Sequence, residues 1–386
     1  MAKSSKTQRA PRGGLALPEA SARALGYRMP AEWEPHAATW LCWPHEAGDW
    51  PGKFATVPWV FAEIARKLVP GERIRLIVAD RAMKKQALSA LSSAGVDVGH
   101  VDCVLAPTNR SWTRDFVPSF VVSSTGPRPR RAAALGDRRR DRIAAVKFRF
   151  NGWARYPNHA ADEAAGQRVA EWLDVESFEP SVRIGNKPRR VVLEGGAIDV
   201  DGQGTLLTTE ECLLDGRQAR NPELGRAGSE QMLSAELGID KVLWLERGIA
   251  GDDTGGHVDD FARFVAPATV VLAQEKRNRD PNHRVLEAAR ERLDGARDAR
   301  GRKLTLVRLP MPAPVVFDGQ RLPASYANFY IGNQAVLVPT FNDPQDRVAL
   351  GILSELFPSR EVVGVHALDL VLGLGTIHCS TQQEPR

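Results

Sequence analysis

Cys379 is the side chain best suited to nucleophilic chemistry. It lies in the segment LGLGTIHCSTQQ, where Gly373 and Gly375 precede it and polar side chains follow it. A thiolate is a strong nucleophile, although a lone cysteine is also a common small buried hydrophobe. His378 is a tempting base, but adjacent residues of an extended segment point to opposite faces. The sequence therefore predicts that the partner of Cys379 comes from elsewhere in the chain.

The segment DDTGGHVDDFARF offers that partner. Gly255 and Gly256 lead into an expected extended run, on which His257 and Asp259 are two residues apart and share one face. This spacing predicts a base beside a cation-binding carboxylate. A structural, hydrogen-bonded histidine is the alternative. Metal binding is a third interpretation, but no further ligand follows at metal-like spacing.

Two other segments contribute acids. In NRSWTRDFVPSFV, Asp115 stands close to Trp112 at the start of an apolar run, and the alternative is that Arg114 and Asp115 only cap a strand. In VVLEGGA, Glu194 ends an apolar run and is followed by two glycines. A buried acid is costly without a partner, so we expect a histidine or an arginine beside Glu194.

The elements that must position these residues follow an α/β pattern, because apolar runs alternate with amphipathic stretches from Met29 onward. The expected strands are 73–78, 143–150, 191–193, 241–245, 269–273, 304–308, 335–338 and 361–365. The expected helices are 59–68, 82–94, 162–173, 230–237, 283–293 and 344–357. Asp343 is expected to cap the last helix, with Pro344 in its first position.

The order of these elements does not suit a doubly wound parallel sheet. DGQG at 201–204 predicts a hairpin turn, and the order strand, strand, helix, strand recurs roughly every 60 to 80 residues. Neither a GxGxxG nor a GxxxxGK loop is present, so nucleotide binding has no support.

Bulk composition is that of a globular protein: 386 residues, 43% hydrophobic and 26% charged. No apolar run is long enough to span a membrane, so we expect a soluble protein without membrane association. The basic residues 1–26 lack the apolar stretch of a secretory signal, and we interpret them as a flexible tail before a single domain, 27–386. The cysteines are too far apart for a zinc site or a disulfide framework, which favours the cytoplasm: Cys42, Cys103, Cys212 and Cys379.

The excess of basic residues is local. The formal net charge is +5 and the pI about 9.1, but much of the excess lies in the tail and in PRPRRAAALGDRRRDR (127–142), with seven arginines against two aspartates. This stretch has no interleaved aromatic residues for base stacking. We therefore expect an arginine-rich loop insertion at 124–142 and no nucleic-acid binding.

Taken together, the motifs resemble agmatine deiminases, whose family also contains bacterial peptidylarginine deiminases, in the guanidino-group-modifying (pentein) superfamily. The resemblance runs from MPAEWEPHAATWLCWPHEAGDWPGKF through WTRD, FNGW, LEGGAIDVDG, TGGHVDDFARF and LPASYANFYIGNQAVLVPTFNDPQD to GTIHCSTQQ. It implies a five-bladed β/α propeller of ββαβ units about a pseudo-fivefold axis, with the active site in a funnel on that axis.

The resemblance also implies roles for individual residues. Cys379 corresponds to the nucleophile, His257 to the general acid/base and Glu194 to the acid that orients the histidine. Asp115 and Asp259 correspond to the carboxylates that grip the guanidinium, and Trp112 is expected to form a wall of the funnel. Departures from the family pattern at Phe116 and Val117, and at Ala154, Arg155 and Tyr156, lie near the funnel and are expected to reshape the pocket for the far end of the substrate.

The implied reaction is the hydrolysis of agmatine to N-carbamoylputrescine and ammonia, in putrescine biosynthesis, through a covalent thiouronium on cysteine. No metal or organic cofactor is expected, because the guanidinium carbon is already electrophilic. The sequence leaves the oligomeric state open. The rival functions are a peptidylarginine or free-arginine deiminase, an amidinotransferase, and a non-catalytic binding protein of the same fold, whose expected signature is the loss of the cysteine or histidine.

Overall fold

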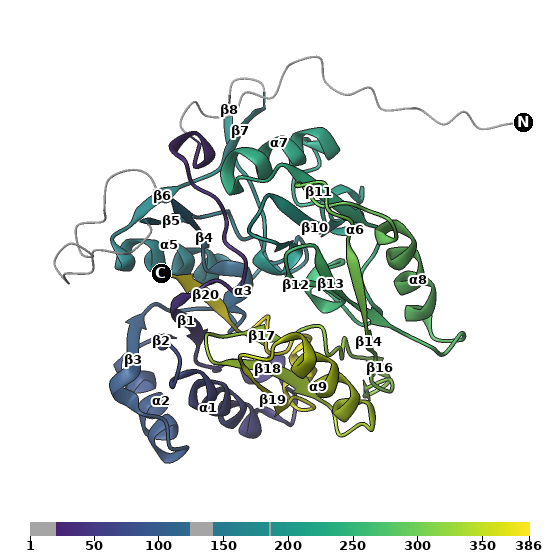
Figure 1. Ribbon diagram of the computed structural model, residues 1–386. Helices are drawn as coiled ribbons and strands as arrows, with labels where there is room; N and C mark the ends of the chain where they lie inside the picture. Colours follow the sequence, from purple (N-terminus) through teal and green to yellow (C-terminus); the bar gives the residue numbers. More distant parts are fainter. Residues whose placement is uncertain (1–20, 124–141, 185–186) are drawn as a thin grey trace, which may run out of the picture.

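Small mixed sheets make up most of the protein. The computed structural model describes residues 21–123, 142–184 and 187–386, and within these ranges the strands form five sheets of three or four strands and two short hairpins. In four of the five sheets, an antiparallel pair is followed by a helical segment and by a strand parallel to the second (Figure 1). The recurring order expected from the sequence is therefore present.

These four sheets follow one another along the chain. Their strands are β4 (Ser119–Ser123), β5 (Arg142–Val146) and β6 (Glu176–Phe178); β9 (Asp199–Val200), β10 (Thr205–Thr209) and β11 (Lys241–Leu245); β12 (Ala262–Ala266), β13 (Thr269–Gln274) and β14 (Thr305–Pro310); and β17 (Tyr330–Ile331), β18 (Ala335–Thr340) and β19 (Glu361–His366). The hairpins are β7 (Ser181–Ile184) with β8 (Lys187–Arg190), and β15 (Val316–Phe317) with β16 (Gln320–Arg321).

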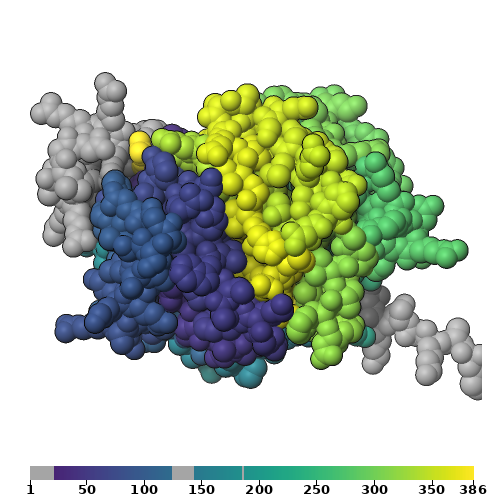
Figure 2. All heavy atoms as spheres, turned by 90° about the horizontal axis from the view of Figure 1, so that it is seen from below, coloured from purple at the N-terminus to yellow at the C-terminus, as the bar shows by residue number. Residues whose placement is uncertain are grey.

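The fifth sheet joins the two ends of the described chain. Its order is β20–β1–β2–β3, where β1 spans His36–Cys42, β2 Arg73–Val78, β3 Val101–Leu105 and β20 Gln382–Pro385. The last strand, β20, pairs antiparallel with β1. Figure 2 shows the N-terminal and C-terminal parts side by side on one face of the molecule. This pairing fixes the segment that carries Cys379, which ends just before β20.

The helices cover these sheets with their apolar faces. Helices α2, α7 and α8 lie toward the periphery in Figure 1. In α1, the buried residues Val57, Phe61, Ile64 and Leu68 recur at helical spacing. The helices are α1 (Val57–Leu68), α2 (Arg81–Ser93), α3 (Thr113–Phe116), α5 (Ala160–Leu173), α6 (Glu210–Leu214), α7 (Gly225–Leu237), α8 (Pro281–Leu293) and α9 (Gln345–Leu356). Among the residues that the structure describes, none of these helices has the length and apolar character needed to cross a membrane.

Most expected elements are present, and the hairpin turn at 201–204 is confirmed between β9 and β10. The expected strand 143–150 ends earlier, at Val146. The expected strand 191–193 is only an isolated bridge through Val192, because the side chain of Asn221 takes both hydrogen bonds of that backbone, at 2.9 and 2.7 Å. At α9, Pro344 itself is the cap residue, while Asp343 accepts a hydrogen bond from the amide of Gln345.

The two segments expected to be loops fall largely outside the described residues. The arginine-rich stretch 124–142 is described only at its last residue, which begins β5. Of the expected tail, residues 21–26 are described and contain a short 3-10 helix, Arg23–Leu25. Arg23 forms an ion pair with Asp240 at 2.5 Å, so this described part of the expected tail contacts the rest of the chain.

Candidate active site

Cys379 lies in a turn and not in the extended segment expected from the sequence. The turn spans residues 377–380 and is held by hydrogen bonds from the amide of Ser380 to the carbonyls of Thr376 and Ile377. The carbonyl of Cys379 accepts a hydrogen bond from the amide of Arg114, in α3. The cysteine is thereby tied both to the WTRD segment and, through β20, to β1, and only 8% of its surface is exposed.

His257 and Asp259 also lie in a different local structure from the one expected. The extended run begins only at Ala262, and Val258–Asp260 form a 3-10 turn with His257 as its cap residue. The preceding Gly256 has φ of +96°, which favours glycine and redirects the chain. Both side chains are buried, and their proximity arises from this turn and not from strand alternation.

His257 and the two carboxylates expected to grip the guanidinium converge on one glycine. A Cβ atom placed on Gly196, which follows Glu194 in the EGG motif, would lie 2.5 Å from Nδ1 of His257 and 3.1 Å from a carboxylate oxygen of both Asp115 and Asp259. No side chain larger than hydrogen fits there without displacing these groups. The glycine therefore allows the three polar side chains to meet.

Asp115 is held by two donors. Its Oδ2 accepts a hydrogen bond of 2.9 Å from the indole of Trp153, and its Oδ1 accepts one of 3.1 Å from the amide of Gly196. Trp153 belongs to the FNGW motif, where Gly152, Trp153 and Ala154 all have positive φ. Such backbone is strained for tryptophan and alanine, so the surrounding structure must hold the indole in this position.

Asp259 keeps one oxygen free. Its Oδ2 accepts a hydrogen bond of 2.6 Å from Nδ1 of His378 and lies 3.9 Å from the sulfur of Cys379. Its Oδ1 is buried without a hydrogen-bond partner among the described residues. A buried acceptor of this kind requires a donor, and a planar cation can supply one.

The role of His378 corrects the sequence-based picture. The histidine was expected to point away from the site, but it bridges Asp259 and Oε2 of Glu32, the latter at 2.8 Å. Glu32 in turn pairs with Arg114 at 3.1 Å and Arg263 at 2.9 Å. His378 therefore belongs to a buried ionic network that fixes Asp259. Its position next to Cys379 was the only sequence signal for it.

Glu194 has the cationic partners that its burial demands. Arg220 donates to both of its oxygens, at 2.9 and 3.0 Å, and Nε2 of His257 lies 3.8 Å away. Burial alone would raise the pKa of Glu194, but Arg220 and His257 hold it below its ordinary value. The expectation of an arginine or histidine beside this acid is confirmed, although the sequence did not indicate which arginine.

The electrostatics keep His257 charged and the thiol neutral when no substrate is bound. Burial lowers the pKa of His257, but Asp115, Glu194 and Asp259 outweigh it and raise the pKa to about 9. Burial raises the pKa of Asp115 to about 6. Burial and the nearby carboxylates hold the pKa of Cys379 well above its ordinary value. A positive charge in front of the sulfur is therefore needed to form the thiolate.

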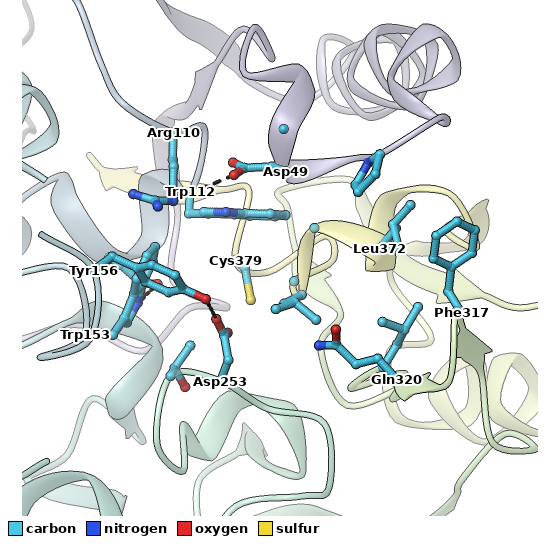
Figure 3. Close-up of a pocket in the computed structure, with 18 of the residues that line it drawn as sticks. Asp49, Arg110, Trp112, Trp153, Tyr156, Asp253, Phe317, Gln320, Leu372 and Cys379 are labelled. Atoms are coloured by element: carbon cyan, nitrogen blue, oxygen red, sulfur yellow. Dashed lines mark hydrogen bonds and ion pairs between the residues drawn. The ribbon is translucent and has the colours of Figure 1, made fainter. Parts of the chain in front are cut away.

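Cys379, Asp115 and Trp112 line a cavity of about 390 Å³. Figure 3 shows the sulfur at its centre, with Tyr156 and Asp253 on one side and Leu372 and Phe317 on the other. Glu194, His257 and Asp259 are buried and do not line the cavity, but His257 lies 3.9 Å from Asp115 and Asp259 lies 3.9 Å from the sulfur of Cys379. The structure thus brings all six candidate residues of the sequence analysis to one region.

Of the five positions that depart from the family pattern, Tyr156 is among the residues that line the cavity, whereas Phe116, Val117, Ala154 and Arg155 are not. Tyr156 lines the cavity, where its hydroxyl donates a hydrogen bond of 2.5 Å to Asp253. Phe116 and Val117 are buried and are not among the residues that line the cavity. The expectation that they reshape the pocket is wrong for direct contact, because they pack into the hydrophobic core.

Two groups of buried side chains have atoms close enough to share a metal ion: Glu194, Cys212 and His257, and Asp259, Asp260 and Cys379. In the first group, Arg220 already supplies a cation to Glu194 at hydrogen-bond distance. In the second, Oδ2 of Asp259 already accepts a hydrogen bond of 2.6 Å from His378. These pairs favour an organic cation over a metal ion as the charge that completes the site.

Comparison with known proteins shows similarity along almost the whole chain. A family model described as Porphyromonas-type peptidyl-arginine deiminase matches residues 28–385. The agmatine deiminase of Medicago truncatula is 38% identical, covering 93% of this chain and 96% of its own length. That of Pseudomonas aeruginosa (strain LESB58) is 34% identical, covering 96% and 99%. The solved structure of the Enterococcus faecalis agmatine deiminase has a TM-score of 0.82 and 32% identity, covering 95% and 98%. The expected α/β pentein fold is thereby confirmed.

Proposed function

Since the chain belongs to the Porphyromonas-type peptidyl-arginine deiminase family, we propose that it is an agmatine deiminase that hydrolyses agmatine to N-carbamoylputrescine and ammonia. One observation carries this proposal: a buried cysteine sulfur faces a cavity next to two carboxylates, and one oxygen of Asp259 has no hydrogen-bond partner among the described residues. A guanidinium presents a planar fork of donors to such acceptors.

Binding orients the guanidinium and activates the thiol. Asp115 and Asp259 hold the N–H groups, which places the guanidinium carbon in front of Cys379. The substrate's positive charge offsets the carboxylates that raise the pKa of the thiol, so Cys379 loses its proton to solvent as the cation binds. His257 remains protonated beside it.

The thiolate then attacks the guanidinium carbon. His257 gives its proton to one nitrogen, the carbon–nitrogen bond breaks, and ammonia leaves from a thiouronium bound to Cys379. Water enters, His257 takes one of its protons, and the oxygen adds to the same carbon. The carbon–sulfur bond breaks, the thiolate leaves, and the ureido product forms as the second proton of the water passes to solvent, where it is taken up by the released ammonia. Glu194, fixed by Arg220, orients the histidine.

The wall of the cavity favours an ammonium group at the far end of the substrate. Asp49 and Asp253 both line it, and Oδ2 of Asp49 is buried without a hydrogen-bond partner in the described part of the chain. The one arginine among the lining residues, Arg110, donates to Asn158 at 3.0 Å from each of its two Nη atoms, and its Nε lies 3.8 Å from Asp49. An α-carboxylate like that of arginine would lie beside these acids, and the guanidinium of Arg110 is already engaged by Asn158 and Asp49.

Turnover of three substrates tests which chemical group the enzyme accepts at the end of the substrate remote from the guanidinium. We expect kcat/KM for agmatine to exceed that for free arginine by about 100-fold or more, because an unpaired carboxylate beside acids costs a few kcal/mol. Ammonia release from agmatine, arginine and an arginyl peptide is to be measured under identical conditions. Faster turnover of arginine or the peptide would assign the protein to the corresponding rival. Formation of an amidino-amine instead of a ureido product would identify an amidinotransferase.

Asp259→Asn is expected to lower kcat/KM by about 30-fold or more. The carboxylate makes a charge-assisted hydrogen bond to the cation, and such a bond contributes about 2 kcal/mol. The matched control is Asp240→Asn, whose partner Arg23 is about half exposed and remote in sequence from the site. An unchanged rate in Asp259→Asn would remove this residue from the site.

We expect kcat/KM to decline in acid with a pKa of about 6. Asp115 must be ionised to hold the guanidinium, and its pKa is raised to about 6. Its contribution is therefore present above pH 6 and lost as the pH falls through this value, at about tenfold per pH unit. A pH profile of initial rates at low substrate concentration measures this, and a flat profile down to pH 5 would contradict it.

We also propose that residues 27–386 form one catalytic domain in which the five sheets are the blades of a propeller. The support is the recurring order of an antiparallel pair and a parallel strand, and the pairing of β20 with β1, which joins the two ends of the chain. The site residues also come from four separate connections between sheets, as a position on a central axis would require: β3 to β4, β8 to β9, β11 to β12, and β19 to β20. An experimental structure of the protein tests the closed ring.

A further inference from the structure

Asn328, in the LPASYANFYIGNQ segment, has no role in the reaction described above, yet its side chain touches the reacting atom. The residue lies just before β17 and is 1% exposed. Its Nδ2 is 3.2 Å from the sulfur of Cys379 and 3.0 Å from Oδ1 of Asp260. The sulfur therefore has an amide nitrogen beside it, from a residue that is not among those that line the cavity.

The surroundings of Asn328 determine which end of its amide faces the sulfur. Its Oδ1 accepts hydrogen bonds from the hydroxyl of Thr376 at 2.7 Å, the amide of His378 at 3.1 Å and the amide of Cys379 at 3.4 Å. All three of these groups are donors. Turning the amide over would place its NH₂ group against them, so the nitrogen must face Asp260 and Cys379.

We propose that Asn328 is a catalytic residue whose amide N–H donates a hydrogen bond to the sulfur of Cys379 and stabilises its thiolate. The contact is weak while the sulfur is a neutral thiol or is bound to carbon. It becomes a charge-assisted hydrogen bond when the thiolate forms before attack, and again when the thiolate leaves after hydrolysis. Such an interaction, stronger near the transition state than in the resting states, accelerates the reaction.

This role explains how a thiolate can exist among acids. The groups facing the sulfur are the carboxyl groups of Asp115, Asp259 and Asp260, each of which raises the pKa of Cys379. The pKa of Asp260 is itself held well above its ordinary value by burial and by the neighbouring carboxylates. Within the described residues, Asn328 is the one side chain that donates an N–H to the sulfur.

The inference rests on the proposed function, but its test does not depend on the substrate. Iodoacetamide reacts with the thiolate, and peptide mass spectrometry resolves the modification of Cys379 from that of the other cysteines. In Asn328→Ala we expect alkylation of Cys379 to slow by about tenfold or more at pH 8, with its pH profile moved to higher pH. For agmatine, kcat should fall by about 10- to 100-fold, with KM changed less.

Two further variants separate stabilisation of the thiolate from support of the turn. Asn328→Asp keeps the acceptor oxygen for Thr376 and the amide of His378 but replaces the donor, and it should slow alkylation at least as much. Asn333→Ala is the matched control, because Asn333 is another asparagine that holds backbone, with hydrogen bonds to His36 and Gly71. It should leave the alkylation profile of Cys379 unchanged.

The wild-type alkylation profile in Asn328→Asp, or in folded Asn328→Ala, would overturn the proposal and leave Asn328 as a support of the turn. If Asn328→Ala does not fold, the Asp variant decides. If the wild-type protein failed to release ammonia from agmatine while the alkylation profiles still differed, the proposed function would fall and the contact with sulfur would stand.

Discussion

Replacing Cys379 by serine is expected to abolish ammonia release, with a loss of more than about 1,000-fold in kcat. Serine preserves the size of the side chain, but its hydroxyl is far less acidic than a thiol, and the nearby carboxylates disfavour any anion at this position. The substrate can still be held by Asp115 and Asp259. Binding without turnover should therefore be detectable by calorimetry with agmatine.

The matched control for this prediction is Cys103→Ser. Cys103 lies in β3, is partly exposed and does not line the cavity. We expect this variant to retain wild-type activity, and thermal unfolding should show both variants to be folded. A Cys379→Ser protein with activity within about tenfold of wild type would exclude the covalent mechanism.

Replacing His257 by alanine is expected to lower kcat by about 100- to 10,000-fold, the range that a positioned general acid/base contributes. The loss has two sources. The departing nitrogen no longer receives a proton, and the charge that partly offsets Asp115 and Asp259 disappears. Asp115 and Asp259 keep their other hydrogen bonds but lose the neighbouring histidine cation, so the variant should still bind the cationic substrate with little loss of affinity.

Single-turnover kinetics distinguish this role from a structural one. Because His257 acts both before and after the covalent intermediate, mass spectrometry of the quenched variant should show the thiouronium forming slowly and decaying slowly. His100→Ala is the control, since His100 is exposed and pairs only with Asp97 in the described structure. Wild-type rates of formation and decay in His257→Ala would contradict its assignment.

The sequence predicted the regular strands better than the turns that carry the site residues. Strands such as β2 and β11 were expected with their exact limits, because a short apolar, β-branched run is itself the signal. The turn at His257 was not, since an H-x-D spacing fits a strand equally well. The left-handed conformation of Gly256 decided between the two.

The chemical identity of the site was set by the sequence alone: a thiol, a histidine and acids within motifs that together resemble one family. Which groups support them was decided only by the tertiary structure. His378 reaches Asp259 across 119 residues of chain, Trp153 reaches Asp115 across 38, and Asn328 reaches Cys379 across 51. Hydrogen bonds between such distant residues leave no periodic pattern in the sequence, because packing of the sheets, and not local spacing, brings their partners within 3 Å or so.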